Sequence, residues 1–229
     1  GQAGSMGDGW SDAFSAQTIS LVLIETSFGR VWEWHLLFCL VALIAATLRH
    51  SRAWLLLLVA ATFALGSLGC IGHAAIDTGG LGILDKASHI LHVLSTGFWV
   101  GSLAPLLYCL REINRPEHGA DADSALRRFS GLGHLAVAIV LGSGISNTWF
   151  VLRDAMPNPN SPYQQLLGAK ILIALTMVIL AIVNRYVFVP RIPDNGPGAR
   201  QLAHGTVAEM VLSAALVGIV SVLGTLPPR

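Results

Sequence analysis

Residues 169–189 read AKILIALTMVILAIVNRYVFV, and this stretch decides the fold class of the chain. A helix needs roughly 20 mostly apolar residues to cross about 30 Å of hydrocarbon, and this run is long enough. Inside a bilayer each backbone amide must be paired within its own helix or within a closed barrel. The strict alternation of apolar and polar residues in a barrel strand is absent here. The run therefore predicts a transmembrane helix.

Similar apolar runs occur along the rest of the chain. Hydrophobic residues make up 53% of the sequence and charged residues only 12%, with a mean hydropathy of +0.63. This composition is far from that of a soluble domain. We therefore expect an all-α, polytopic transmembrane helix bundle over residues 28–229. Its spans, about six in number, are expected near residues 31–48, 53–71, 88–110, 129–152, 169–189 and 204–226.

The first 20 residues are small and polar, and they lack the basic segment and apolar core of a signal peptide. We interpret residues 1–27 as an extracytoplasmic loop. Because the sequence starts with Gly1 in such a loop, we expect it to be a fragment of a longer protein.

The basic residues between the runs predict the orientation, because cytoplasmic loops are enriched in Lys and Arg. One set of loops carries Arg49, Arg52, Arg111, Arg115, Arg127, Arg128, Arg185, Arg191 and Arg200, and the other carries Arg30, Lys86, Arg153, Lys170 and Arg229. The first set is richer and is expected in the cytoplasm. Residues 72–87, residues 153–168 and the C-terminus are then expected outside.

Several classes of function find no support in the sequence. The formal net charge is only +1, so the clustered basic face that binds nucleic acid is not expected. No Gly-rich phosphate loop, Ser/His/Asp order or paired-carboxylate pattern stands out. We therefore expect neither an enzyme nor a nucleic-acid partner, and we expect the bilayer to be the main surroundings.

Four histidines fall near the predicted outer ends of the first three runs: His35, His73, His89 and His92. His89 and His92 are three residues apart on one helix, so both rings project from the same face and can reach one ion. Imidazole binds copper, zinc, nickel or iron. His73 closes the second run and could return to the same site, with His35 as a further candidate. The alternative is that the four are separate interfacial histidines, and spacing alone does not decide between the two.

Sulfur donors lie close to these histidines in the sequence. Cys70 precedes His73 by three residues, and Cys39 follows His35 by four. Thiolate and thioether ligands favour Cu(I) over harder ions, which makes Cys70 a further candidate ligand. The alternative is that each cysteine is only a small buried residue in an apolar helix.

Other polar and aromatic residues within the runs suggest further roles. Asn147 could serve as a later station for an ion. Glu209 could hydrogen-bond inside the bundle or relay protons, since polar groups at membrane depth usually face the bundle interior. Trp32, Trp34 and Trp99 are expected in an aromatic belt at the outer interface.

Several ordered segments resemble one known family. They are Thr26–Trp32 (TSFGRVW), Gly72–Ala75 (GHAA), His89–Gly101 (HILHVLSTGFWVG), Phe129–Asn147 ending in GISN, Pro162–Lys170 (PYQQLLGAK), Asn184–Arg185 and Leu223–Pro228 (LGTLPP). Their order and spacing resemble the copper resistance protein D (CopD/PcoD) family of bacterial inner-membrane proteins, and they extend over nearly the whole chain.

The resemblance implies about eight spans, of which the missing pair would precede Gly1. It also implies that copper is the ion, that a periplasmic copper-binding protein of the CopC type is a partner, and that His73, His89 and His92 carry the binding. His35 departs from the family pattern, which commonly has a basic residue near that position.

Three hypotheses remain open at this point. The first is a copper transporter that takes copper in from the periplasm and serves copper homeostasis or resistance. The second is a membrane protein that holds haem b between paired histidines on neighbouring helices and transfers electrons. The third is a copper receptor or scaffold that does not transport.

Overall fold

The structure is a computed structural model, and it describes residues 20, 24, 26–71, 79–113, 117, 119–153, 156, 158–192 and 198–226. Six α-helices account for most of these residues: α3 (Ser27–Thr47), α4 (Ala53–Leu68), α5 (Gly79–Glu112), α6 (Gly119–Leu152), α7 (Pro162–Val183) and α8 (Gly198–Leu223). A π-helix, η3 (Asn184–Phe188), and a short 3-10 helix, η4 (Val189–Arg191), extend α7. No strand occurs in the described part of the chain, so the all-α prediction is confirmed.

Five of the helical segments are long and apolar enough to cross a membrane. They are Phe28–Thr47, Gly80–Glu112, Ser124–Leu152, Pro162–Arg191 and Gly198–Leu223. The helix expected near residues 53–71 is shorter, because α4 has 16 residues and is about 24 Å long at 1.5 Å per residue. Of the six or so spans that the sequence predicts, the described residues contain five of full length and one short apolar helix.

Tight packing accompanies the early end of α4. Gly69 follows the helix, and a Cβ atom there would lie 2.7 Å from the Cα of Ile90 on α5. Only glycine allows so close a backbone approach. The helix thus ends where it meets α5, three residues before the predicted boundary.

Two predicted loops are shorter than expected. Helix α5 begins at Gly79, within the expected loop 72–87, and α7 begins at Pro162, within the expected loop 153–168. Ser161 caps α7 by accepting a hydrogen bond from the amide of Gln164, and proline suits the first helical turn. Helix α5 opens with a glycine-rich turn followed by Asp85 and Lys86, and α7 opens with Gln164 and Gln165, so hydropathy does not predict these starts.

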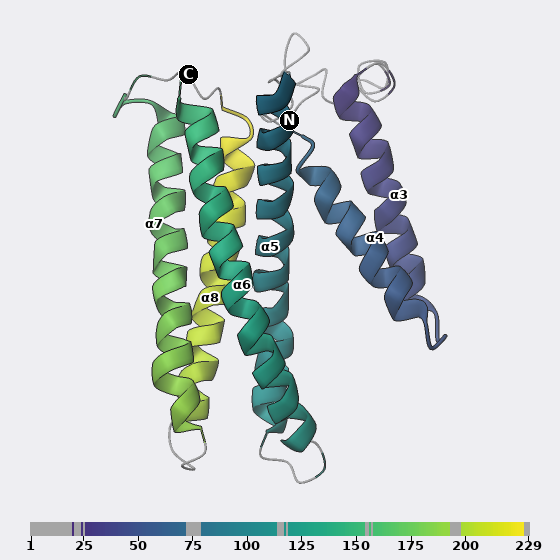
Figure 1. The fold of residues 1–229 in the computed structure, drawn as a ribbon, viewed down its shortest axis with the longest axis vertical. Coiled ribbons are helices and arrows are strands. Elements are labelled where there is room, and N and C mark those ends of the chain that lie inside the picture. The colour runs from purple at the N-terminus through teal and green to yellow at the C-terminus, as the bar shows by residue number, and fades with distance from the viewer. Residues whose placement is uncertain are drawn as a thin grey trace. The chain divides into compact units, whose positions relative to one another are not determined.

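The chain forms two compact units. The first contains residues 1–94 and 143–151, and in it α3 and α4 form an antiparallel hairpin (Figure 1). Phe38 of α3 stacks on Phe63 of α4, with ring centroids 5.3 Å apart. Thr26 caps α3 by accepting a hydrogen bond from the amide of Gly29. The first turn of α3 is therefore fixed where the N-terminal polar segment gives way to apolar sequence.

The second unit contains residues 95–142 and 152–229. Its core is formed by Trp99 and Leu103 of α5, Ala136 and Val140 of α6, and Met177 of α7. Leu212 and Leu216 of α8 pack against these residues. Trp99 is only 5% exposed, so its expected place in an interfacial aromatic belt was wrong.

Many large apolar side chains point outward in both units, among them Leu36, Leu43, Ile145, Leu172 and Val217. A water-soluble protein rarely exposes so much contiguous apolar surface. Lipid chains solvate such side chains well, so this surface agrees with a helical membrane protein.

Candidate functional site

The first unit holds two histidines of α5 against polar residues of α6. His92 Nδ1 lies 3.0 Å from Ser143 Oγ, and His89 Nδ1 lies 3.4 Å from Asn147 Nδ2. Both rings therefore face the same neighbouring helix, as their three-residue spacing predicts. The result is a pair of imidazoles on one helix face, held by polar partners within two helices long and apolar enough to span a membrane.

The amide of Asn147 is oriented by a third residue. Ser88 Oγ donates a hydrogen bond to Asn147 Oδ1 at 2.7 Å, and it also lies 3.4 Å from the carbonyl oxygen of Ser143. With Oδ1 engaged, the amide nitrogen faces His89, and an amide nitrogen can only donate. Asn147 therefore contacts the ring of His89 through its amide nitrogen.

Gly144 makes room for the ring of His92. A Cβ atom at this position would lie 3.4 Å from His92 Cε1, which is close to the limit of ordinary contact. A Cβ atom would thus touch the ring, and glycine leaves the ring more room than any other residue. The small residue in the Gly144–Asn147 motif thus has a packing role that the sequence alone did not show.

His35 has a different set of neighbours, on α3 and α4. Its Nδ1 lies 2.9 Å from the carbonyl oxygen of Ala64 and 3.0 Å from Ser67 Oγ. Its Nε2 lies 3.6 Å from Cys39 Sγ. The ring of Trp32 meets the His35 ring edge to face, with centroids 5.1 Å apart. The structure thus places His35 in the α3–α4 hairpin, with contacts distinct from those of His89 and His92.

The remaining predicted ligands are not drawn into one cluster. His73 lies outside the described residues. Cys70 is exposed just past the end of α4, where its amide bonds to the carbonyl oxygen of Ser67. Among the residues that the structure describes, no three His, Cys, Asp or Glu side chains gather closely enough to hold one metal ion. The assignment of His73 and Cys70 therefore stays a prediction.

A second polar cluster lies buried in the other unit. Glu209 of α8 is 3% exposed, and its two carboxyl oxygens accept hydrogen bonds from Asn184 Nδ2 at 2.6 Å and from Trp99 Nε1 at 3.3 Å. A buried polar group is costly without partners, and here both oxygens have one. Glu209 thus hydrogen-bonds within the bundle. Its possible role as a proton relay stays a prediction.

The partners of Glu209 depend on an irregular turn of helix. Asn184 opens the π-helix that follows α7, and such insertions often occur at functional positions. The amide of Asn184 packs directly onto Gly205 of α8, where a Cβ atom would overlap it. Sequence reasoning noted Asn184 only as a polar residue in an apolar run. Its pairing with Glu209 needed the π-helix, which hydropathy does not show.

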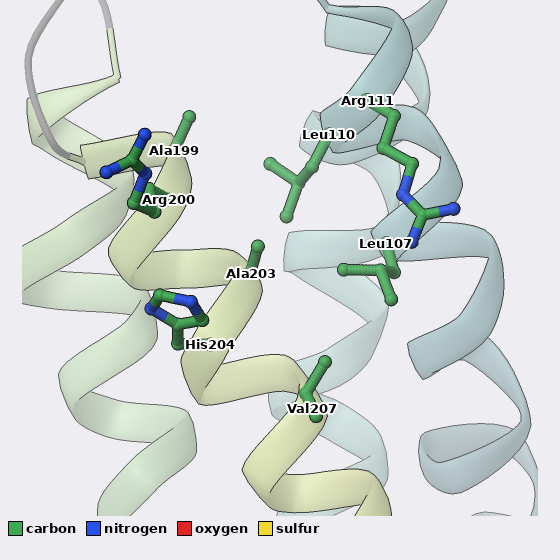
Figure 2. Close-up of a pocket in the computed structure, with 8 residues that line it drawn as sticks. All are labelled: Leu107, Leu110, Arg111, Ala199, Arg200, Ala203, His204 and Val207. Atoms are coloured by element: carbon green, nitrogen blue, oxygen red, sulfur yellow. The ribbon is translucent and has the colours of Figure 1, made fainter.

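A pocket of about 370 Å³ also lies in the second unit, between the end of α5 and the start of α8. Figure 2 shows Leu107 and Leu110 on one side and Ala199, Ala203 and Val207 on the other. Arg111, Arg200 and His204 also line the pocket, but their side chains do not converge on one point (Figure 2). This mainly apolar space lacks the grouped nitrogen donors of a metal site.

Comparisons with known proteins identify the family. A family model described as the N-terminal domain of copper resistance protein D-like proteins matches residues 1–83, and the model of copper resistance protein D matches residues 123–223. The inner membrane protein YebZ of Escherichia coli (strain K12) is 36% identical over 231 residues, which cover 99% of this chain and 78% of that protein. The chain belongs to the copper resistance protein D family.

Two further relatives carry names that refer to copper. Copper resistance protein D of Pseudomonas syringae pv. tomato is 28% identical over 226 residues, covering 91% of this chain and 71% of that protein. Copper transport protein CutJ of Bacillus subtilis (strain 168) is 31% identical over 186 residues, covering 78% of this chain and 34% of that protein. No solved structure matches the chain.

Family membership and the spanning helices together make this a multi-pass inner-membrane protein of a copper resistance and transport family. The two matched ranges include some residues of both polar clusters and His35. Ser143, Asn147, Asn184 and Glu209 lie in the second range and His35 in the first. His89 and His92 lie between the two ranges, within the alignment to YebZ, which covers 99% of the chain.

Proposed function

We propose that this protein binds copper at the face of α5 that carries His89 and His92, on the periplasmic side, and conducts copper across the inner membrane. The observation that supports this most is the placement of two imidazoles on one face of an apolar helix, each against a polar residue of α6. Polar side chains at membrane depth usually mark an ion or substrate pathway. In this reading copper is the cargo, and transport inward serves copper homeostasis or resistance.

The hydrogen bonds around the pair can adapt to a bound ion. A metal-ligating histidine usually donates its other ring N–H to an oxygen, which fixes the tautomer. Ser143 Oγ can accept such a bond from His92 Nδ1. A rotation of the Asn147 amide would offer Oδ1 to His89 Nδ1 in the same way, and the hydroxyl of Ser88 can either donate or accept. Ser143 and Asn147 then orient the two copper ligands without binding copper themselves.

The haem hypothesis fits this geometry less well. A haem iron with two axial histidines needs imidazoles on opposite faces of the porphyrin, from positions that face each other. His89 and His92 come from one face of one helix, so they cannot enclose a flat ring between them. A small ion bound beside both rings matches the pair better.

A copper carrier must deliver the ion to this face. We propose a periplasmic protein of the CopC type as the partner, as the family resemblance implies. Such a protein would pass copper directly to the region where α5 contacts α6, so that the ion is not released into solution. A receptor that captures copper without moving it shares the same site, and only a transport measurement separates the two.

Metal loading of the purified protein tests the binding site. We expect copper to be retained after loading with Cu(I) or Cu(II), and we expect the double variant His89→Ala/His92→Ala to lose this copper. The variant His89→Gln/His92→Gln keeps hydrogen-bonding side chains and guards against loss of fold. His134→Ala is the matched control, because His134 bonds to Tyr186 in the other unit. Equal copper content in the wild type and both double variants would contradict the assignment.

A visible spectrum of the same samples tests the haem alternative. We expect no Soret absorption from the protein purified from cells supplied with haem. A Soret band that disappears in the His89→Gln/His92→Gln variant would show that this site binds haem and not copper.

A further inference from the structure

His35 is held in a single tautomer by α4. Its Nδ1 lies 2.9 Å from the carbonyl oxygen of Ala64, and a carbonyl oxygen only accepts, so Nδ1 carries the hydrogen. Ser67 Oγ donates to the same carbonyl oxygen at 2.7 Å and lies 3.0 Å from Nδ1. In the neutral ring Nε2 then has a lone pair. A backbone carbonyl that fixes a ring in this way is the usual support of a metal-binding histidine.

That lone pair points to a thiol one helical turn away. Nε2 lies 3.6 Å from Cys39 Sγ, and Cys39 is exposed. With metal bonds of about 2.0–2.1 Å to nitrogen and about 2.3 Å to sulfur, two ligands of one ion lie about 3.5 Å apart at a tetrahedral angle and about 4.3 Å apart when opposed. The observed separation falls inside this interval. An ion can therefore bridge the two atoms without any movement of the helix backbone.

We infer that His35 and Cys39 form a second copper site, selective for Cu(I), separate from the His89–His92 pair. This inference rests on the proposed copper function and extends it. On binding, the Cys39 thiol loses its proton to solvent, a Cu–S bond forms and His35 Nε2 donates its lone pair to the ion. No electron is transferred, because copper arrives and stays as Cu(I).

Charge and ligand type both select Cu(I) at this position. A thiolate and Cu(I) have opposite unit charges, so the loaded site is neutral, whereas Cu(II) or Zn(II) would leave a net positive charge that is costly in hydrocarbon. Thiolate is also a soft ligand, which favours Cu(I). Structural zinc takes four ligands, and among the described residues no third His, Cys, Asp or Glu joins this pair.

The pair lies near the middle of α3. Helix α3 extends over Ser27–Thr47, so its midpoint is Leu37, and His35 and Cys39 lie two residues on either side of it. At 1.5 Å per residue the two ligands lie within about 3 Å of the helix centre along its axis. The pair thus lies within a helix that is long and apolar enough to cross a membrane.

X-ray absorption at the copper edge tests this inference, using the whole protein in detergent loaded with Cu(I) under reducing conditions. We expect a sulfur ligand in the wild type and in the His89→Gln/His92→Gln variant. Cys39→Ser should abolish the sulfur signal and lower the bound Cu(I) by one ion per chain. Cys70→Ser and Cys109→Ser are matched controls that should keep both the sulfur signal and the amount of bound Cu(I).

Two further variants distinguish the role of the His35 ring from the role of the groups that hold it. His35→Gln should weaken Cu(I) binding at this site by at least tenfold in a competition titration. Ser67→Ala should have little effect, because the Ala64 carbonyl still holds Nδ1. A sulfur signal that survives Cys39→Ser would overturn the inference and leave the His89–His92 proposal standing. Absence of bound copper in every form would overturn both.

Discussion

At the scale of single residues, small side chains create the space that the polar ones use. Gly144 lies beside the ring of His92, and Gly205 lies beside the amide of Asn184. Neither role could be predicted from the sequence, because glycine is common in membrane helices and hydropathy treats all its positions alike. The histidine pair itself could be predicted, since the three-residue spacing fixes one face.

Gly144 provides a direct test of how tightly the ring of His92 must be held. We expect Gly144→Val to displace the ring from Ser143 and to weaken copper binding by about 10- to 100-fold, the usual effect of disturbing a ligand's support. Competition titration with a copper chelator measures this. Gly142→Val is the matched control, because a Cβ atom at Gly142 meets nothing within 4 Å. Equal affinity in the two variants would show that the ring position does not matter.

Glu209 tests whether the buried cluster stabilises the second unit. Glu209→Leu removes the acceptor for both Asn184 Nδ2 and Trp99 Nε1, and each buried donor without a partner costs about 1–3 kcal/mol. We expect a clear fall in the thermal unfolding temperature in detergent. Glu209→Gln keeps one acceptor oxygen, so its unfolding temperature should lie between those of the wild type and of Glu209→Leu.

The exposed residue Glu33 gives the comparison for that measurement. Glu33→Leu should leave the unfolding temperature nearly unchanged, since the side chain is solvated or interfacial. If Glu209→Leu were as stable as Glu33→Leu, the cluster would have no structural role, and only transport could explain why the carboxyl is buried.

At the scale of helices, apolar runs predicted where each helix lies but not where it ends. The start of α5 is glycine-rich and that of α7 is polar, so hydropathy does not include them, and a cap such as Ser161 followed by Pro162 marks the true start of α7. Hydropathy does not predict the π-helix after α7, in which Asn184 packs against Gly205 of α8. The buried position of Trp99 is not predictable from the sequence either, because its hydrogen-bond partner Glu209 is 110 residues away.

Packing of α7 against α8 makes a prediction at this scale. A Cβ atom at Gly205 would overlap the Asn184 amide, so Gly205→Ala should push the π-helix away from α8. Overpacking of this kind typically costs about 1–3 kcal/mol. Thermal unfolding should show a loss of about 2–4 °C for each kcal/mol in a protein of this size.

Gly218 on the same helix is the matched control for that substitution. A Cβ atom at Gly218 meets nothing within 4 Å, and alanine favours helix over glycine by up to about 1 kcal/mol. Gly218→Ala should therefore be neutral or slightly stabilising. A similar loss of stability in both variants would show that the contact with Asn184 is not the cause.

At the scale of the whole molecule, the sequence predicts an orientation that the fold alone does not determine. The loops richer in arginine are expected in the cytoplasm, which places the C-terminus in the periplasm. A C-terminal alkaline phosphatase fusion should then be active, and a C-terminal green fluorescent protein fusion should be dark. The reverse pattern would place the His89–His92 end of α5 in the cytoplasm and would argue for export in place of import.

Copper flux into proteoliposomes tests the central claim most directly. The purified protein is reconstituted, Cu(I) held by a weak chelator is added outside, and an indicator inside reports its entry. We predict copper entry that depends on the protein, falls at least tenfold in the His89→Gln/His92→Gln variant and is unchanged in His134→Ala. Entry at the wild-type rate in the double variant, or no entry with a wild-type protein that binds copper, would contradict the claim.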